Sequence, residues 1–316
     1  MAIDEVRPAD EKVTVKHIYV SPHSDDVALS CGGQIIANPA SKTDTVILNV
    51  FTSNQPQSGP REKRETALFD SLNSERTLED RSAWESIGIQ TRYLDLPEAL
   101  LRGRFPFQLL GSGNDLGMQD ALLDAIRGCA ASYPGANFYF PAGIGNHVDH
   151  VICRDAAFRL LGEGILDRIF LYEDIPYSWL KFLRDQYYRS LRRRVDTDQA
   201  GCVQAFRRDG ETLSGYLTKK RVPFPRGKKL FPIVYFSGFL ANPFGGPSSS
   251  KKDYRASLQK IGLTADQMTR KKELLYSYKS QIPMLFGNNP EESLAGHRES
   301  FSMEILIEVT KSRPGT

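Results

Sequence analysis

A short apolar segment, 16–20, runs directly into a loop that carries three groups able to bind a ligand or take up a proton. The segment is β-branched and aromatic and a Ser-Pro pair ends it, which predicts a buried strand. His23 follows in the loop, and Asp25 and Asp26 fall where the next apolar residues predict the start of a helix. Ligands of open α/β sheets bind at the carboxyl ends of the strands. We therefore expect these three side chains in such a crevice.

The adjacent carboxylates of Asp25 and Asp26 indicate a bound cation. Two neighbouring carboxylates repel each other unless a cation or a proton intervenes. A tight loop can direct the His23 imidazole and the Asp26 carboxylate to one metal ion, which leaves one acid free to act on a bound water. An Asp helix cap beside a solvated Asp and an incidental His is the alternative that this stretch alone leaves open.

A second cluster of the same kind lies more than a hundred positions further on, at His147-Val-Asp149-His150. An aromatic strand beginning at Asn137 leads through a Pro/Gly loop into this cluster, which opens a helix over 151–161. Three of the five histidines of the chain fall in the two clusters. Their matching positions favour one shared site over coincidence.

The two clusters resemble the signatures of the PIG-L/LmbE-type N-acetylglucosaminyl deacetylases. Residues 21–26, Ser-Pro-His-Ser-Asp-Asp, are similar to the family's Pro-His-x-Asp-Asp motif, and residues 147–150 to its His-x-Asp-His motif. Ser24 departs from the proline that is commonest in the family, and Val27 from the glutamate of many members. The resemblance implies an α/β, Rossmann-like fold: a mostly parallel sheet flanked by helices, with an elaborated C-terminal region.

The resemblance also implies an activity and a set of roles. The activity is a metal-dependent hydrolysis that removes an acetyl or other acyl group from the amine of an N-acetylated amino sugar or its conjugate. The resemblance implies Zn²⁺, with another divalent cation such as Fe²⁺ as an alternative. The metal ligands would be His23, Asp26 and His150, and the catalytic residues would be Asp25 as general base, His147 at the oxyanion and Asp149 orienting His147. We expect the His147 ring to be protonated there, because the charge of Asp149 favours that state.

Further segments resemble the same family and supply candidates for substrate binding. They are an Arg-x-x-Glu helix at 76–79, a strand and loop at 93–98, an acidic Pro-Tyr segment at 172–177 and a C-terminal helix at 271–286. The substrate-binding candidates in these segments are Arg76, Asp95, Glu98 and Tyr177. A surface ion pair for the arginine and a solvated position for each acid are the alternatives.

Strands and helices are expected to alternate along the chain, which supports a parallel sheet. Besides the segments above, the pattern predicts strands at 43–51 and 165–172 and helices from 25 or 26 to about 38, at 61–88 and at 119–131, with a loop at 99–118. We expect a core at 1–180 and, at 181–316, a C-terminal extension that shapes the substrate cleft. Residues 181–230 are strongly basic and form either a rim for an anionic substrate or a solvated helical face. Residues 230–240 suggest a strand or lid flap, followed by a loop at 242–250.

Composition excludes several other classes of protein. A net charge of +3 over 316 residues does not indicate a nucleic-acid binder. The sequence contains no run of eighteen apolar residues, so we expect no membrane-spanning helix. The N-terminus lacks the pattern of a signal peptide, so we expect a cytoplasmic location. Cys31, Cys129, Cys153 and Cys202 show no metal-ligand spacing and are expected to be small buried hydrophobes. The oligomeric state is left open.

Two other functions remain open at this point. A metal-dependent phosphoesterase also uses Asp and His at strand ends, but usually needs ligands for two ions, so counting metals separates it from the deacetylase. A catalytically inactive carbohydrate-binding relative would be expected to lack the base or one ligand. The sequence contains every residue type that the deacetylase requires.

Overall fold

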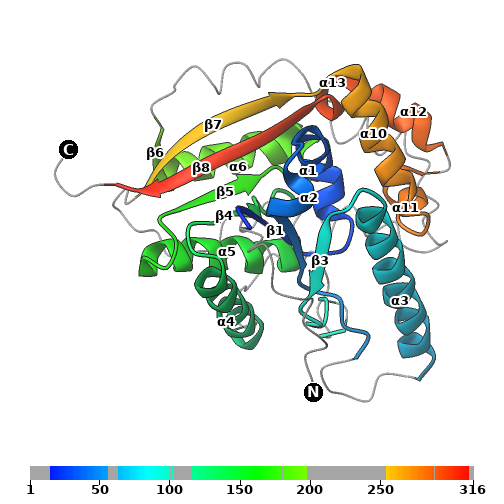
Figure 1. Cartoon of the computed structure of the whole chain (residues 1–316), viewed down its shortest axis with the longest axis horizontal. Coiled ribbons are helices and arrows are strands. Elements are labelled where there is room, and N and C mark those ends of the chain that lie inside the picture. Colours follow the sequence, from blue (N-terminus) through cyan, green and yellow to red (C-terminus); the bar gives the residue numbers. More distant parts are fainter. Residues whose placement is uncertain are drawn as a thin grey trace.

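A single mixed sheet with helices on both faces forms the centre of the molecule (Figure 1). The computed structural model describes residues 15–55, 63–99, 101–102, 116–179, 181–197, 254–287 and 289–312. The sheet has eight strands in the order β3-β2-β1-β4-β5-β8-β7-β6. The α/β class and the flanking helices expected from the sequence are confirmed.

The first five strands are parallel and are joined by helical crossovers. The strands are β1 (His17–Ser21), β2 (Thr45–Asn49), β3 (Gln90–Tyr93), β4 (Asn137–Pro141) and β5 (Arg168–Tyr172). The helices among them are α1 (Asp26–Ala37), α2 (Ser41–Asp44), α3 (Lys63–Ser86), α4 (Leu116–Ser132) and α5 (Val148–Glu163). Parallel neighbours need such crossovers because a tight turn cannot join them.

The C-terminal part of the chain extends the same sheet. Strand β8 (Met303–Lys311) is antiparallel to β5 and to β7 (Tyr254–Gly262), and β6 (Val195–Thr197) is parallel to β7. In Figure 1 the red β8 lies between the green β5 and the orange β7. The remaining helical elements are η2 (Tyr177–Trp179), α6 (Lys181–Arg194), α10 (Ala265–Tyr276), α11 (Ile282–Phe286), α12 (Pro290–Gly296) and α13 (Arg298–Phe301). The domain boundary at 180 stays a prediction.

Alternate side chains of the strands pack into two separate apolar cores. In β1, Ile18 and Val20 face the core shared with α4, α5 and α6, while Tyr19 faces the core shared with α1, α3 and α10. The same alternation occurs in β2, β4, β5 and β8. Because successive side chains of a strand point to opposite faces, a sheet covered by helices on both sides is apolar at every position. Cys31 and Cys153 are fully buried in these cores, as expected, whereas Cys129 is only half-buried, so the expectation is wrong there. Cys202 lies outside the described residues.

Several expected boundaries are wrong, for local reasons. Residues 41–44, partly assigned to the strand at 43–51, form the single turn α2, in which the Thr43 hydroxyl donates to the Ala40 carbonyl. Strand β3 begins at Gln90 and ends at Tyr93, so most of the segment 93–98, expected as a strand and loop, is loop. The C-terminal helix expected at 271–286 is interrupted between α10 and α11. The segments expected at 230–240 and 242–250, and residues 103–115 of the expected loop, lie outside the described residues.

The close approach of α1 to the C-terminal region requires glycine at position 33. A Cβ atom there would lie 2.3 Å from Leu263 Cδ1 and 2.8 Å from Glu304 Oε1. Gly33→Ala should therefore lower the free energy of unfolding by about 1–3 kcal/mol, measured in urea. Gly128→Ala in α4 is the control, because no atom lies within 4 Å of the added carbon. That control should be neutral or stabilising by up to about 1 kcal/mol, and equal losses in both variants would contradict the packing argument.

No helix in the described ranges combines the length and the apolar composition needed to cross a bilayer.

Candidate functional site

The two histidine clusters meet at the ends of two neighbouring strands. Strands β1 and β4 pair side by side, and the strand order runs outward from them in opposite directions, through β2 on one side and β5 on the other. This reversal is the switch point at which open α/β sheets bind ligands. His23 follows β1 and His147 follows β4. Both histidine clusters therefore lie at the edge of the sheet at which the sequence predicted them.

A strained loop places His147 at the start of α5. Gly143, Gly145 and Asn146 have positive φ values of 76°, 89° and 54°, a region that favours glycine and tolerates asparagine. At Gly145 a Cβ atom would also lie 2.7 Å from the Tyr177 ring. His147 then caps α5, because its Nδ1 accepts the backbone N–H of Asp149 at 3.3 Å.

Asp26 lies between two imidazoles. Its Oδ2 atom is 3.1 Å from His23 Nδ1 and 3.2 Å from His150 Nε2, and it accepts the backbone N–H of His23 at 2.8 Å. One ligand atom from each of the three side chains lies within 4.8 Å of the others. Donor atoms held at about 2.0–2.1 Å around a tetrahedral zinc lie about 3.3 Å apart. The described residues therefore include a His/Asp/His group whose spacing and donor chemistry fit a divalent metal.

Each of these two imidazoles has a second carboxylate on its other ring nitrogen. Asp149 Oδ2 is 3.1 Å from His23 Nε2, and Asp174 Oδ1 is 2.6 Å from His150 Nδ1. Asp174 is almost fully buried, and its second oxygen accepts the Ile144 N–H at 2.8 Å. Carboxylates placed in this way fix the tautomer and the orientation of metal-binding histidines. Sequence reasoning did not select Asp174, although it noted the acidic segment 172–177.

Asp149 contacts residues other than the one that the sequence assigned to it. Its carboxylate is 3.9 Å from His147 Nδ1, too far for a hydrogen bond. It accepts instead from Arg102 Nη2 at 2.7 Å and from the Ala99 N–H at 3.0 Å, in addition to contacting His23. Asp149 is fully buried and the Arg102 side chain is 2% exposed. Arg102 could not be selected from the sequence, because its segment has no regular pattern.

Burial and neighbouring charges separate the pKa values of the two adjacent acids. Burial, followed by the charge of Asp26, raises the pKa of Asp25 to about 6. Burial also acts to raise the pKa of Asp26, but the charges and hydrogen bonds of His150 and His23 outweigh it, and the net pKa is lowered. Two carboxylates whose environments move their pKa values apart can serve as an acid-base group and as a permanently charged ligand.

His147 differs electrostatically from what the sequence suggested. Protonation of its ring was expected, with Asp149 favouring it. In the structure burial, and next the charge of His23, lower the pKa of His147 well below its usual value. Its Nδ1 accepts a hydrogen bond, so the neutral ring carries its hydrogen on Nε2. This neutral ring remains a hydrogen-bond donor.

The four candidates for substrate binding are placed differently with respect to the clusters. Arg76 Nη1 lies 3.6 Å from Glu98 Oε2, and the Arg76 charge acts to lower the pKa of Asp25. The Tyr177 ring meets the His150 ring edge-on at 5.9 Å. Asp95 is exposed, and its backbone N–H donates to the Thr52 hydroxyl. Arg76 and Tyr177 therefore lie beside the clusters, whereas Asp95 lies on the exposed loop after β3.

The acids that follow Arg76 on α3 bind the C-terminal segment. Glu79 accepts from the backbone N–H and hydroxyl of Ser280, at 2.8 and 2.7 Å. The fully buried Asp80 accepts from Asn49, Tyr93 and Tyr278 at 2.7–2.8 Å. These bonds fix the turn of α3 that carries Arg76.

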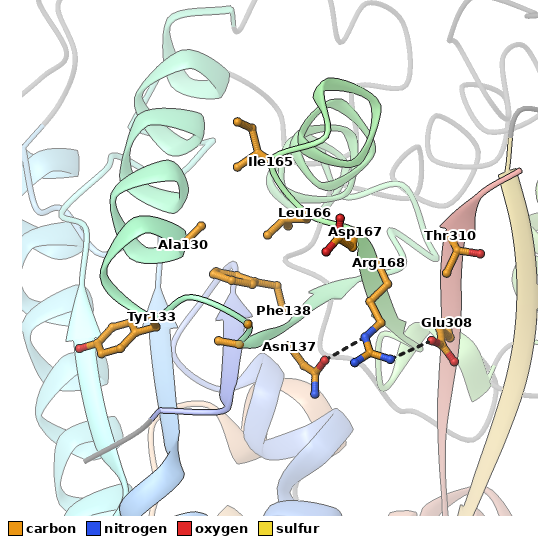
Figure 2. A pocket seen from close by; sticks show the side chains of 12 residues that line it. Ala130, Tyr133, Asn137, Phe138, Ile165, Leu166, Asp167, Arg168, Glu308 and Thr310 are labelled. Atoms are coloured by element: carbon orange, nitrogen blue, oxygen red, sulfur yellow. Dashed lines mark hydrogen bonds and ion pairs between the residues drawn. The ribbon is translucent and has the colours of Figure 1, made fainter. Parts of the chain in front are cut away.

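A cavity of about 420 Å³ lies at the opposite end of the sheet (Figure 2). It is lined in part by Asn137 and Arg168, the first residues of β4 and β5, whereas the histidine clusters follow the last residues of β1 and β4. Arg168 donates to Asn137 at 3.1 Å and pairs with Glu308 at 3.7 Å. The described residues that line this cavity include no histidine or cysteine, and the two histidine clusters lie at the other end of the sheet.

Comparison with protein families identifies one match, which includes both clusters. Residues 18–161 match the model of the family PIG-L, described as GlcNAc-PI de-N-acetylase. Over 170 residues the chain is 34% identical to the 2'-N-acetylparomamine deacetylase of Streptomyces fradiae, an alignment that covers 51% of this chain and 57% of that relative. The enzyme of the same name from Niallia circulans is 29% identical over 198 residues, 53% of this chain and 70% of the relative.

Solved structures share the fold over nearly the whole chain. A deacetylase of teicoplanin biosynthesis, solved as a complex with bog, has a TM-score of 0.62 at 19% identity and covers 95% of this chain and 100% of its own. The zinc inhibited form of teicoplanin deacetylase gives 0.61 at 18% identity with the same coverage. At these identities the likeness shows a common fold.

Proposed function

We propose that the protein is a metal-dependent hydrolase that removes an acetyl group from the amine of an N-acetylated amino sugar or its conjugate. The match of residues 18–161 to the PIG-L family model supports this proposal. The single observation that best supports this proposal is the convergence of His23, Asp26 and His150 beside a second buried acid, Asp25. The matched deacetylases of Streptomyces fradiae and Niallia circulans act on an N-acetylated amino sugar compound, according to their names.

The metal ligands proposed are His23, Asp26 and His150. Two imidazoles and one carboxylate are a ligand set known from catalytic zinc sites with an open position. A metal bound there would polarise a carbonyl oxygen and lower the pKa of a coordinated water. Zinc is the ion proposed, because imidazole and carboxylate groups are among its usual ligands in proteins; a teicoplanin deacetylase of similar fold has been solved in a form described as zinc inhibited.

Asp25 is proposed as the general base. It is 8% exposed, and its pKa of about 6 lies near the pH at which a carboxylate both accepts a proton and returns it efficiently. It would take the proton of the attacking water and later deliver it to the leaving amine. Asp26 cannot share this role, because its carboxylate is held between two imidazoles.

His147 is proposed to stabilise the oxyanion, as a neutral donor instead of a cation. Its Nδ1 is occupied by the backbone N–H of Asp149, which leaves the hydrogen on Nε2 for the developing negative charge. A fixed donor in a buried site stabilises such a charge more than a donor in water does. Arg76, Glu98 and Tyr177 are proposed to contact the sugar beside the metal. Asp95 would contact the sugar only if the exposed loop that carries it reaches the substrate.

Release of free acetate tests the proposal. The purified chain is incubated with N-acetylglucosamine, its phosphatidylinositol conjugate, 2'-N-acetylparomamine and an N-acetylated glycopeptide, each with and without a chelator. We expect acetate from at least one substrate, loss of release with the chelator and recovery with added zinc. Release that persists in the chelator would exclude a metal-dependent mechanism, and inactivity toward every N-acetylated amine would contradict the deacetylase.

A further prediction concerns Asp174, whose carboxylate contacts His150 Nδ1. Asp174→Asn should weaken zinc binding by about 10–100-fold, because an amide does not raise the basicity of the imidazole as a carboxylate does. Competition with a fluorescent chelator measures the dissociation constant. Asp120→Asn is the control, since Asp120 is 61% exposed on α4. Equal affinity in the Asp174 variant and the control would show that His150 does not bind the ion.

A further inference from the structure

Two possible metal groups share one imidazole. The first is His23, Asp26 and His150, and the second is His23, His147 and Asp149; in each, the ligand atoms lie within 4.8 Å of one another. The two ring nitrogens of His23 face the two groups, with Nδ1 toward Asp26 and Nε2 toward Asp149. A site of this kind could hold one ion or two, and the difference decides its chemistry, because two-metal sites suit phosphoryl transfer.

The two groups differ in the cation that is already present. Asp149 Oδ1 accepts from Arg102 Nη2 at 2.7 Å, and both side chains are almost completely buried. Asp26, in contrast, is contacted by the backbone N–H of His23 and by imidazoles, which become neutral when they release a proton to bind a metal. Charge interactions in a buried site are screened far less than in water. An arginine beside Asp149 therefore neutralises that carboxylate and repels a divalent ion at the second group.

The position of Arg102 is fixed by further contacts. Its Nη1 donates to the Pro97 carbonyl at 2.6 Å, and its guanidinium lies 5.1 Å from the centre of the Phe51 ring. The neighbouring Ala99 N–H occupies Asp149 Oδ2 at 3.0 Å. A metal at the second group would have to displace or crowd these donors. Arginine stays charged at every physiological pH, so this obstacle is permanent.

We propose that Arg102 is a positioning residue that restricts the site to one divalent ion, bound by His23, Asp26 and His150. It acts through Asp149, whose charge it balances, and it thereby keeps His147 out of a metal site. Removing the guanidinium creates a second position for zinc at His23, His147 and Asp149. This inference rests on the proposed function, because it takes the first group as the metal site.

Counting bound zinc by equilibrium dialysis and elemental analysis tests the inference. The wild type should bind one zinc per chain, and Arg102→Gln should bind a second with at least tenfold weaker affinity. Arg102→Lys, which keeps the charge, should bind one. Arg127→Gln is the matched control, because Arg127 is a half-exposed arginine of α4 paired with Asp124 and Glu163, and this variant should also bind one zinc. Adding His147→Ala to Arg102→Gln should abolish the second zinc.

The outcomes separate this inference from the function on which it rests. A wild type that binds no zinc contradicts the proposed function. A wild type that binds two, or a folded Arg102→Gln that binds one, overturns the role of Arg102 while the deacetylase proposal stands. Circular dichroism identifies variants that fail to fold. If Arg102→Gln fails to fold, His147→Ala in the wild-type background tests the inference instead. The inference requires that this variant still binds one zinc per chain, and a loss of zinc would contradict it.

Discussion

Asp25→Asn is expected to lower the rate of acetate release by about 10²–10⁴-fold while the zinc content stays at the wild-type level. The amide cannot take the proton from water, but it occupies the same buried volume beside Asp26. The rate is measured under substrate saturation, and zinc is measured in the same preparation by elemental analysis. Because the imidazoles of His23 and His150 contact the carboxylate of Asp26, the metal site should be retained when Asp25 is changed.

The control for this experiment is Asp124→Asn, at a carboxylate that is 77% exposed on α4. It should leave both the rate and the zinc content unchanged. If Asp25→Asn and His150→Ala lose zinc to the same extent, then Asp25 is a ligand and the proposed division of roles is wrong.

Lys271→Met should lower the free energy of unfolding by about 3–5 kcal/mol, the largest effect on stability that we expect. Lys271 and Glu304 are both fully buried, with Nζ and Oε1 2.7 Å apart. Glu304 also accepts the backbone N–H groups of Gly33 and Gln34 in α1, each at 2.7 Å. Without the lysine, a buried carboxylate would remain between β8 and α1 with no balancing charge.

Urea unfolding measures this loss, and Lys272→Met is the matched control. Lys272 pairs with Glu291, which is 62% exposed, and exposed pairs contribute about 0–1 kcal/mol. Adding Glu304→Gln to Lys271→Met should recover part of the lost stability, since it removes the uncompensated charge. A double variant that is less stable than Lys271→Met would show that the charge is not the cause.

The sequence predicted the parts of the fold that depend on local pattern. The strand before His23 and the helix after it follow from a short apolar run, a Ser-Pro stop and two helix-opening acids, and β1 and α1 occupy these positions. The antiparallel β7 and β8 were not predicted. Their pairing joins residues far apart in sequence, and strand propensity depends strongly on such tertiary context.

The sequence predicted the three metal-ligand candidates but not the contacts around them. The sequence identified His23, Asp26 and His150, which the structure brings together. It did not identify the contacts made by Asp149. A contact between an arginine in an irregular loop and an acid on a helix leaves no periodic pattern in the sequence. Arg102 lies in such a loop and Asp174 at the end of a strand, and only the folded chain shows that both lie behind the histidines.

Anomalous diffraction from crystals grown with zinc tests the central claim most directly. The account predicts one zinc peak per chain, at bonding distance from His23, Asp26 and His150, with Asp25 beside it and unbound. A peak bound by His147 and Asp149 instead, or imidazoles of His23 and His150 directed to different ions, would contradict it.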